Sequence, residues 1–242
     1  MSFARIPVIA RPFVSERAKK TLDLVENFVE EDCIPADTVF AQQLNANGYD
    51  TKYQFSTHPT VLEDLKRKAK SLGLWNLFLP KAHFKEGAGF SNLEYGLMAE
   101  LLGKSDIAPE ACNCNAPDTG NMEVLAKWSS GAGDENCKIY IVMGGGFEVV
   151  QGRLGPGRIR HAMRSIGAAE KALEYMLARL NNPAKKPFGQ TLSSHGIQLE
   201  RVARSRIEID TARLSVLNAA ITIDEMGAKA AMKEIAKYKY LQ

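Results

Sequence analysis

Apolar side chains recur every three or four residues over most of the first 127 residues, which is the spacing of one face of an α-helix. Ser15 is a good N-cap residue, and the first apolar stripe begins just after it. That stripe consists of Ala18, Leu22, Val25 and Val29. We expect this first helix to end at Cys33-Ile-Pro35, and the polar segment 36–57 to be a loop with at most a short helical piece.

Three more helices are predicted in the same part of the chain. One follows Pro59 and stops at Gly73, because proline suits the start of a helix and glycine its end. The next begins at Ser91 and Glu94, which have the spacing of a capping box. Another begins at Asp118, a capping residue. The segment after Gly73 is apolar and aromatic, so we expect residues 73–80 to form a buried connection.

A single strand is predicted in the chain, at the apolar run Ile139–Met143. A glycine-rich turn follows and leads into a long helix, with Pro156 in its first turn. The apolar stripe of this helix is Ile159, Met163, Ile166, Ala169 and Leu173. Four arginines place positive charge at the entrance of the helix: Arg153, Arg158, Arg160 and Arg164. Their residue chemistry alone favours solvated side chains at a helix start over a ligand site.

The last third of the chain is helical again, with a long helix predicted from Leu192 to about Asp224 and a last one from Lys229 to Tyr240. Apolar residues repeat every seven positions in the long helix, and small residues stand three positions after the first three of them. The apolar positions are Val202, Ile209, Val216 and Ile223, and the small ones are Ser205, Ala212 and Ala219. This pattern lets helices approach closely, and core packing explains it better than a dedicated partner surface.

Composition excludes several classes of function. The chain has 242 residues, 45% of them hydrophobic, and a net charge of +3, which is too small for a nucleic-acid-binding protein. Apolar runs are too short to span a membrane. The four cysteines are too few and scattered for a disulfide framework, and Cys112 and Cys114 lack a second pair for a metal site. His58, His83, His161 and His195 lack ligand spacing.

Three segments carry a resemblance to a known family. Phe147-Glu-Val-Val-Gln-Gly-Arg-Leu-Gly-Pro-Gly-Arg-Ile159 resembles the start of the C-terminal helical domain of acyl-CoA dehydrogenases. Segments 73–80 and 113–125 resemble the N-terminal helical domain of that family. The second of these is close to diagnostic of the eukaryotic long acyl-CoA dehydrogenases that can carry a phosphotransferase domain.

The resemblance implies a mainly α fold of the acyl-CoA dehydrogenase type, with an internal deletion and a C-terminal truncation. We expect an N-terminal helical domain over residues 1–127, a vestige of the middle β-domain over residues 128–150, and a truncated C-terminal antiparallel helical bundle over residues 151–242. Most of the family's middle domain, which packs on the flavin, has no counterpart in the sequence.

The resemblance also implies site residues. Ser129, in a Trp-Ser-Ser-Gly segment, matches the hydroxyl that meets the flavin edge, and Trp128 is adjacent to it. Phe188 lies in the loop that touches the FAD of a neighbouring subunit, so a homo-oligomer is expected. Arg158 matches an arginine that faces the acyl-CoA, although Gly155 replaces the acidic residue that often accompanies it.

No catalytic residue is assigned, because the family's base and its second flavin loop match nothing in this sequence. Glu208, Asp210, Asp224 and Glu225 were weighed as substitutes, and solvated helix faces explain them better. The implied function is FAD-dependent α,β-dehydrogenation of acyl-CoA thioesters, with little or no activity in this shortened form. A non-catalytic helical remnant or interaction protein is the alternative. The family implies an intracellular location, mitochondrial or peroxisomal, and the sequence does not decide between them.

Overall fold

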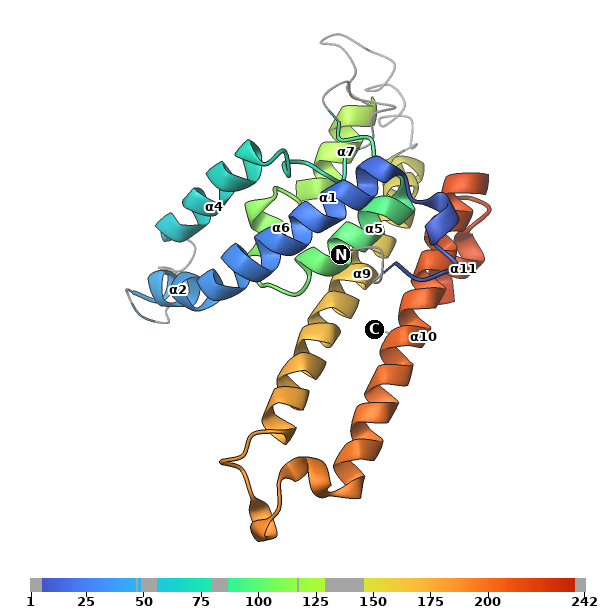
Figure 1. Ribbon diagram of the computed structural model, residues 1–242. Coiled ribbons are helices and arrows are strands. Elements are labelled where there is room, and N and C mark those ends of the chain that lie inside the picture. Colours follow the sequence, from blue (N-terminus) through green and yellow to red (C-terminus); the bar gives the residue numbers. More distant parts are fainter. Residues whose placement is uncertain are drawn as a thin grey trace.

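The structure is a computed structural model, and it describes residues 6–46, 48, 56–79, 87–116, 118–128 and 146–237; the side chains of 125–128 and 146–153 are not part of this description. Helices dominate these residues, and no strand occurs among them. The shorter helices gather around one end of a long antiparallel pair, α9 (Gly146–Leu180) and α10 (Gly196–Met226) (Figure 1). The mainly α fold is therefore confirmed. The strand expected at Ile139–Met143 lies outside the described residues.

The first helix continues past the point where the sequence predicted its end. Helix α1 (Glu16–Asn27) runs through a π-helical turn, η3 (Phe28–Cys33), into α2 (Ile34–Leu44). The N–H of Ile34 donates to the carbonyl of Val29, five residues earlier. This wider turn places Pro35 in the first turn of α2, where its missing N–H is not needed. The predicted end at Pro35 is wrong for that reason, and much of the predicted loop 36–57 is helix.

The other N-terminal helices follow the sequence prediction closely. Helix α4 (Thr60–Ser71) starts after Pro59, and Gly73, with a φ of 73°, follows its end. Helix α5 (Asn92–Leu102) has the expected capping box at Ser91 and Glu94, and α7 (Asp118–Trp128) begins at Asp118. The structure has one further short helix between α5 and α7, which the sequence did not predict. It is α6 (Ala108–Ala111). Four apolar side chains of the connection after α4 are buried: Leu74, Leu77, Phe78 and Leu79.

Helix α5 lies at the centre of the fold, and every residue from Leu93 to Ala99 is buried. It crosses α9 at two glycines. A Cβ atom on Gly103 would overlap the carbonyl oxygen of Arg164, and one on Gly167 would overlap the carbonyl oxygen of Glu100. The two backbones are therefore in direct contact, which joins the N-terminal helices firmly to the C-terminal pair.

Helix α9 begins earlier than the sequence predicted, because Pro156 lies inside it rather than in its first turn. A proline inside a helix costs one hydrogen bond and strains the preceding turn. This part of α9 packs on the C-terminal segment that includes α11 (Met232–Lys237): Gly155 is buried, and a Cβ atom built on it would lie 3.3 Å from Cβ of Ala228 and 3.6 Å from Cδ1 of Ile235. Residues 146–150, predicted as strand or loop, are helical as a result.

The seven-residue repeat of α10 is core packing, as predicted. Ile209, Val216, Ala219 and Ile223 are buried, while Val202 and Ala212 pack half-buried against the core. Helix α10 starts at Gly196, after 3₁₀ turns at Pro187–Gly189 and Leu192–Ser194, and ends before Gly227, whose φ is 86°. Helix α11 follows over Met232–Lys237 and begins three residues later than the predicted helix, whose expected end at Tyr240 lies outside the described residues.

Candidate functional site

The two N-terminal segments that resemble the acyl-CoA dehydrogenases lie against each other. Nδ2 of Asn113 donates to Oδ1 of Asn76 over 2.7 Å, and the N–H of Asn76 donates to the carbonyl of Cys112 over 3.1 Å. Both asparagines are in the left-handed region, with φ of 59° at Asn76 and 53° at Asn113. Asparagine tolerates this conformation better than most residues do. The two segments therefore form one structural unit beside α9.

Two of the arginines predicted at the entrance of the helix lie well inside α9, because α9 begins at Gly146, and they bind this unit. Arg160 is 7% exposed, pairs with Glu123 of α7 and donates to the carbonyl of Phe78 over 3.4 Å. Its guanidinium carbon lies 5.4 Å from the ring centroids of both Phe78 and Tyr95. Its Nε has no hydrogen-bond partner among the described residues. The interpretation of Arg160 as a solvated side chain is therefore wrong, because its carboxylate partner comes from another helix.

Arg164 also donates hydrogen bonds to the same unit. Its Nη1 donates to the carbonyl of Cys114 over 3.3 Å and to Oδ1 of Asn115 over 3.2 Å, and its Nη2 lies 3.0 Å from Nδ1 of His161. Arg158 differs from both: it is exposed and makes no hydrogen bond or ion pair with the residues that the structure describes. Among the described residues, Arg158 is thus an unpaired cation on the same helix as two arginines that are bound by neighbouring segments.

The cysteines near this unit are structural. Cys33, Cys112 and Cys114 are free and buried. Burial raises the pKa of the Cys33 thiol to about 12, and it raises the pKa of Cys112 and Cys114 as well. A thiol with a raised pKa is a poor nucleophile and a poor metal ligand. Among the described residues no group of His, Cys, Asp or Glu could hold a metal ion.

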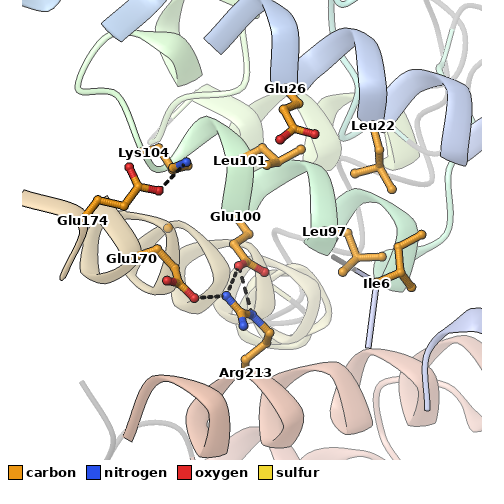
Figure 2. Close-up of a pocket in the computed structure, with 11 residues that line it drawn as sticks. Ile6, Leu22, Glu26, Leu97, Glu100, Leu101, Lys104, Glu170, Glu174 and Arg213 are labelled. Atoms are coloured by element: carbon orange, nitrogen blue, oxygen red, sulfur yellow. Dashed lines mark hydrogen bonds and ion pairs between the residues drawn. The ribbon is translucent and has the colours of Figure 1, made fainter. Parts of the chain in front are cut away.

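A second site, which sequence reasoning missed, is a cavity of about 300 Å³ where α1, α5, α9 and α10 meet (Figure 2). Two ion-pair networks border it. Arg213 of α10 pairs with Glu100 of α5 and Glu170 of α9, and Lys104 pairs with Glu174 over 2.8 Å and with Glu30. The spacing of Arg206, Asp210 and Arg213 within α10 is visible in the sequence, but the partners on other helices are not.

The carboxyl groups in the first network have different environments. Burial raises the pKa of Glu100, although Arg213 opposes the effect. Burial alone would also raise the pKa of Glu170. Hydrogen bonds from Arg206 and Arg213 outweigh the effect of burial, so the pKa of Glu170 is lowered. The two distances from Arg206 to Glu170 are 2.8 and 2.6 Å. The network is therefore a permanent link between α5, α9 and α10.

Comparison with known proteins matches this architecture to one family. Residues 144–241 match the family model described as acyl-CoA dehydrogenase, C-terminal domain. The protein named "Probable acyl-CoA dehydrogenase FadE2", from Mycobacterium tuberculosis, is 32% identical over 301 residues, which cover 76% of this chain and 72% of that protein. The chain belongs to the acyl-CoA dehydrogenase family. The resemblance of its three segments is therefore confirmed.

Other members of the acyl-CoA dehydrogenase family are similar over nearly the whole chain. A structure of a protein that carries the acyl-CoA dehydrogenase name, from Mycobacterium abscessus, aligns with a TM-score of 0.79 at 27% identity and covers 93% of this chain and 84% of its own. Acyl-CoA dehydrogenase family member 11 of Rattus norvegicus is 31% identical over 346 residues, 93% of this chain and 43% of that protein. The chain thus spans less than half the length of this relative.

The same alignment shows an internal difference from the family. It is 346 positions long, whereas the chain has 242 residues, so at least 104 positions (346 minus 242) of the aligned region have no counterpart in this chain. The expected gap lies between the N-terminal helical part and Phe147, where the family's middle domain belongs. This difference agrees with the internal deletion that the sequence predicted.

The described residues cover only part of the set expected to hold FAD. Trp128 is the last residue of α7, which packs beside the start of α9, while Ser129 lies outside the described residues. Phe188 stands beyond the other end of α9, at the tip of the hairpin (Figure 1). Thirty-five helical residues at roughly 1.5 Å each separate the two ends by about 50 Å. Within one chain, Phe188 therefore lies far from Trp128.

Phe188 is nevertheless an unusual residue. Its side chain is 96% exposed, its φ is 58°, and its ring meets His195 edge-on with 6.3 Å between the ring centroids. A bulky residue in the left-handed region is strained, and exposing an aromatic ring gains nothing within one chain. These features suit a side chain that contacts another molecule.

No helix among the described residues is long and apolar enough to cross a membrane.

Proposed function

We propose that this chain is an acyl-CoA-binding member of its family in which Arg158 contacts the ligand, and that it catalyses little or no α,β-dehydrogenation. One observation carries the proposal: Arg158 is exposed and unpaired among the described residues, while Arg160 and Arg164 on the same helix are fixed by neighbouring segments. A free guanidinium can make charge-assisted hydrogen bonds to the phosphate or carbonyl oxygens of an acyl-CoA.

The low turnover follows from what the reaction requires. Dehydrogenation needs a carboxylate within hydrogen-bond reach of the α-carbon, and a bound flavin supplies the hydride acceptor. Three of the candidate carboxylates are engaged elsewhere: Glu208 pairs with Arg204, Asp210 pairs with Arg206, and Asp224 caps α5. Glu225 is exposed at the end of α10. Ser129 lies outside the described residues and Phe188 is expected to touch the FAD of a neighbouring subunit, so the described residues of one chain supply only part of the expected flavin contacts.

The proposal keeps the three-part organisation expected from the family. Residues 1–127 form the N-terminal helical part, residues 128–150 are the remnant of the middle domain, and residues 151–242 are the C-terminal helical part. The direct contact between α5 and α9 supports treating the first and third parts as one packed unit. Arg158 stands near the start of the third part, beside α7.

Isothermal titration with octanoyl-CoA tests the proposal. We expect Arg158→Ala to weaken binding by about tenfold or more, because a hydrogen bond to a charged group contributes about 1.5–3 kcal/mol. Arg179→Ala is the matched control, since Arg179 is an exposed arginine in the last turn of the same helix. Equal affinity of the Arg158 variant and the parent would contradict the assignment. Steady dye reduction with octanoyl-CoA and added FAD would contradict the low turnover.

A helical interaction protein is the second candidate, and the far end of the hairpin favours it. Large apolar side chains are exposed there on both helices and on the connection between them. They are Tyr175, Leu177, Phe188, Ile197 and Leu199. Monomeric proteins expose few such groups together, so this end is suited to contact with another chain. A chain that associates through this end but binds no octanoyl-CoA would support this candidate over the first.

A further inference from the structure

The far end of the α9–α10 hairpin holds the excess positive charge of the chain. We call residues 175–204 the basic tip: they are the last six residues of α9, the connection and the first nine residues of α10. The basic tip contains one anion, Glu200, and five cations, which are Arg179, Lys185, Lys186, Arg201 and Arg204. Its net charge is +4, whereas that of the whole chain is +3, so the residues outside it together carry −1. Such an uneven distribution indicates an electrostatic interaction surface.

Most of these cations have no counterion within the described part of the chain. All five are exposed. Arg204 pairs with Glu208 over 3.2 Å, whereas the side chains of the other four make no hydrogen bond or ion pair with the residues that the structure describes. Four positive charges therefore stand in solvent at one end of the molecule.

The basic tip also exposes large apolar side chains among its cations. They are Tyr175, Leu177, Phe188, Ile197 and Leu199. Phe188, the most exposed of them, follows Lys186 by two residues, and Leu199 precedes Arg201 by two. Cations interleaved with exposed apolar groups are typical of surfaces that enter the interface of an anionic bilayer. The cations meet the headgroups there, and the apolar groups reach the boundary of the acyl chains.

The shape of the hairpin suits contact with a flat surface. The basic tip projects away from the shorter helices, which gather around the opposite end of the α9–α10 pair (Figure 1). Local hydrogen bonds hold the connection: the N–H of Lys185 donates to the carbonyl of Asn182 over 3.0 Å, and the N–H of Gly189 donates to the carbonyl of Lys186 over 3.1 Å. Phe188 is therefore presented on a formed turn, which reduces the ordering that binding requires.

We propose that the basic tip binds the surface of an anionic phospholipid bilayer, with Lys185 and Lys186 at the headgroups and Phe188 inserted at the acyl-chain boundary. Each cation near such a surface strengthens binding roughly fivefold. A nucleic acid fits less well, because aliphatic side chains such as Leu199 do not stack on bases as aromatic rings do. Arg158 lies 22 residues before Leu180, about 33 Å along α9, so the proposal is independent of acyl-CoA binding there.

Another copy of the chain could cover the same apolar side chains, and the cations separate the two cases. The residues outside the basic tip carry a net charge of only −1, so another copy offers little negative charge in total, whereas an anionic bilayer offers a continuous negative surface. Lipid binding therefore requires Lys185 and Lys186. Burial of Phe188 against another copy does not.

Vesicle flotation with the full chain tests the proposal. We expect the chain to float with vesicles of equal parts phosphatidylserine and phosphatidylcholine at about 0.1 M salt, but not with pure phosphatidylcholine vesicles. Binding should fall steeply at about 1 M salt, where the Debye length shortens from about 10 to 3 Å. The double variant Lys185→Ser and Lys186→Ser should bind about tenfold more weakly or worse, while its oligomers in sedimentation velocity match those of the parent.

Two further variants complete the test. Phe188→Ser keeps every cation and should weaken vesicle binding about tenfold or more, because the inserted ring is lost. The double variant Lys229→Ser and Lys233→Ser removes two exposed lysines beyond the opposite end of α10 and should bind like the parent. Equal flotation with neutral vesicles, or unchanged affinity of the Lys185 and Lys186 variant, would overturn the proposal. Oligomers without flotation would also overturn it and assign the basic tip to another copy.

Discussion

At the scale of single residues, hydrogen bonds between distant segments decide roles that the sequence leaves open. The capping box of Ser91 and Glu94 could be predicted because both residues lie in one turn. Glu94 also accepts from the N–H of Ser15, 79 residues away, over 2.8 Å. Asp224 was expected to be solvated, yet it accepts from the N–H groups of Asn92 and Leu93, both over 2.9 Å. Spacing alone cannot reveal a cap that comes from another helix.

Asp224 should therefore contribute to stability as an N-cap. We expect Asp224→Ala to lower the free energy of unfolding by about 1–2 kcal/mol, because two N–H groups of α5 lose a charged acceptor. Urea denaturation followed by circular dichroism measures the change. Glu225→Ala, at the next and exposed position, should change the free energy by less than about 0.5 kcal/mol. A similar loss in both variants would show that Asp224 has no capping role.

Glu170 provides a prediction about pH. Hydrogen bonds from Arg206 and Arg213 outweigh burial and hold the pKa of Glu170 below its ordinary value in the unfolded chain, so its contribution to stability is present above that ordinary value and is lost as the pH falls through the folded pKa. We expect Glu170→Gln to destabilise the chain at pH 7 by about 2 kcal/mol, since two arginines lose a partner. The difference from the parent should shrink below about pH 4. Denaturant midpoints at several pH values test this, and a difference independent of pH would refute it.

At the scale of elements, the sequence predicts helices well wherever the signal is local. The predicted helices before residue 128 were correct in type, and their starts at Ser15, Pro59, Ser91 and Asp118 agree with the structure. Two of the errors involve proline. Pro35 follows a π turn that spacing does not encode, and Pro156 sits inside α9 because Gly155 packs on α11. In each case contacts with other parts of the chain outweigh a local rule that is usually valid.

The crossing of α5 and α9 gives a sharp test at this scale. Gly167→Ala would place a methyl group against the carbonyl oxygen of Glu100, so we expect a loss of at least about 3 kcal/mol or failure to fold. Gly157→Ala is the matched control in the same helix, because a Cβ atom there meets nothing within 4 Å. Alanine has the higher helix propensity, so this control should stabilise the chain by up to about 1 kcal/mol. Comparable stability of the two variants would show that the backbones do not touch.

At the scale of the whole molecule, the fold could be predicted from the sequence, but the partners that distant helices supply to Arg160 and Arg213 could not. The resemblance assigned Phe188 to a loop that touches the FAD of a neighbouring subunit, and the structure places the turn that holds Phe188 at the end of α9 opposite to Trp128 (Figure 1). The ends of a helix about 50 Å long cannot share a ligand within one chain. A homo-oligomer would remove this difficulty, because the tip of one hairpin could then reach the α7 end of another copy.

Self-association is therefore the expected behaviour, and the tip of the hairpin is the surface to test. Phe188 is 96% exposed and Leu199 is 54% exposed, so burying them against another copy would recover apolar area that the single chain leaves in water. We expect sedimentation velocity to show oligomers for the parent chain at micromolar concentration. The double variant Phe188→Ser and Leu199→Lys should shift the distribution toward monomer. Leu72→Lys, at the C-cap of α4, is the matched control and should sediment like the parent. A parent that remains monomeric, or a double variant that associates as the parent does, would rule out this surface as the site of self-association.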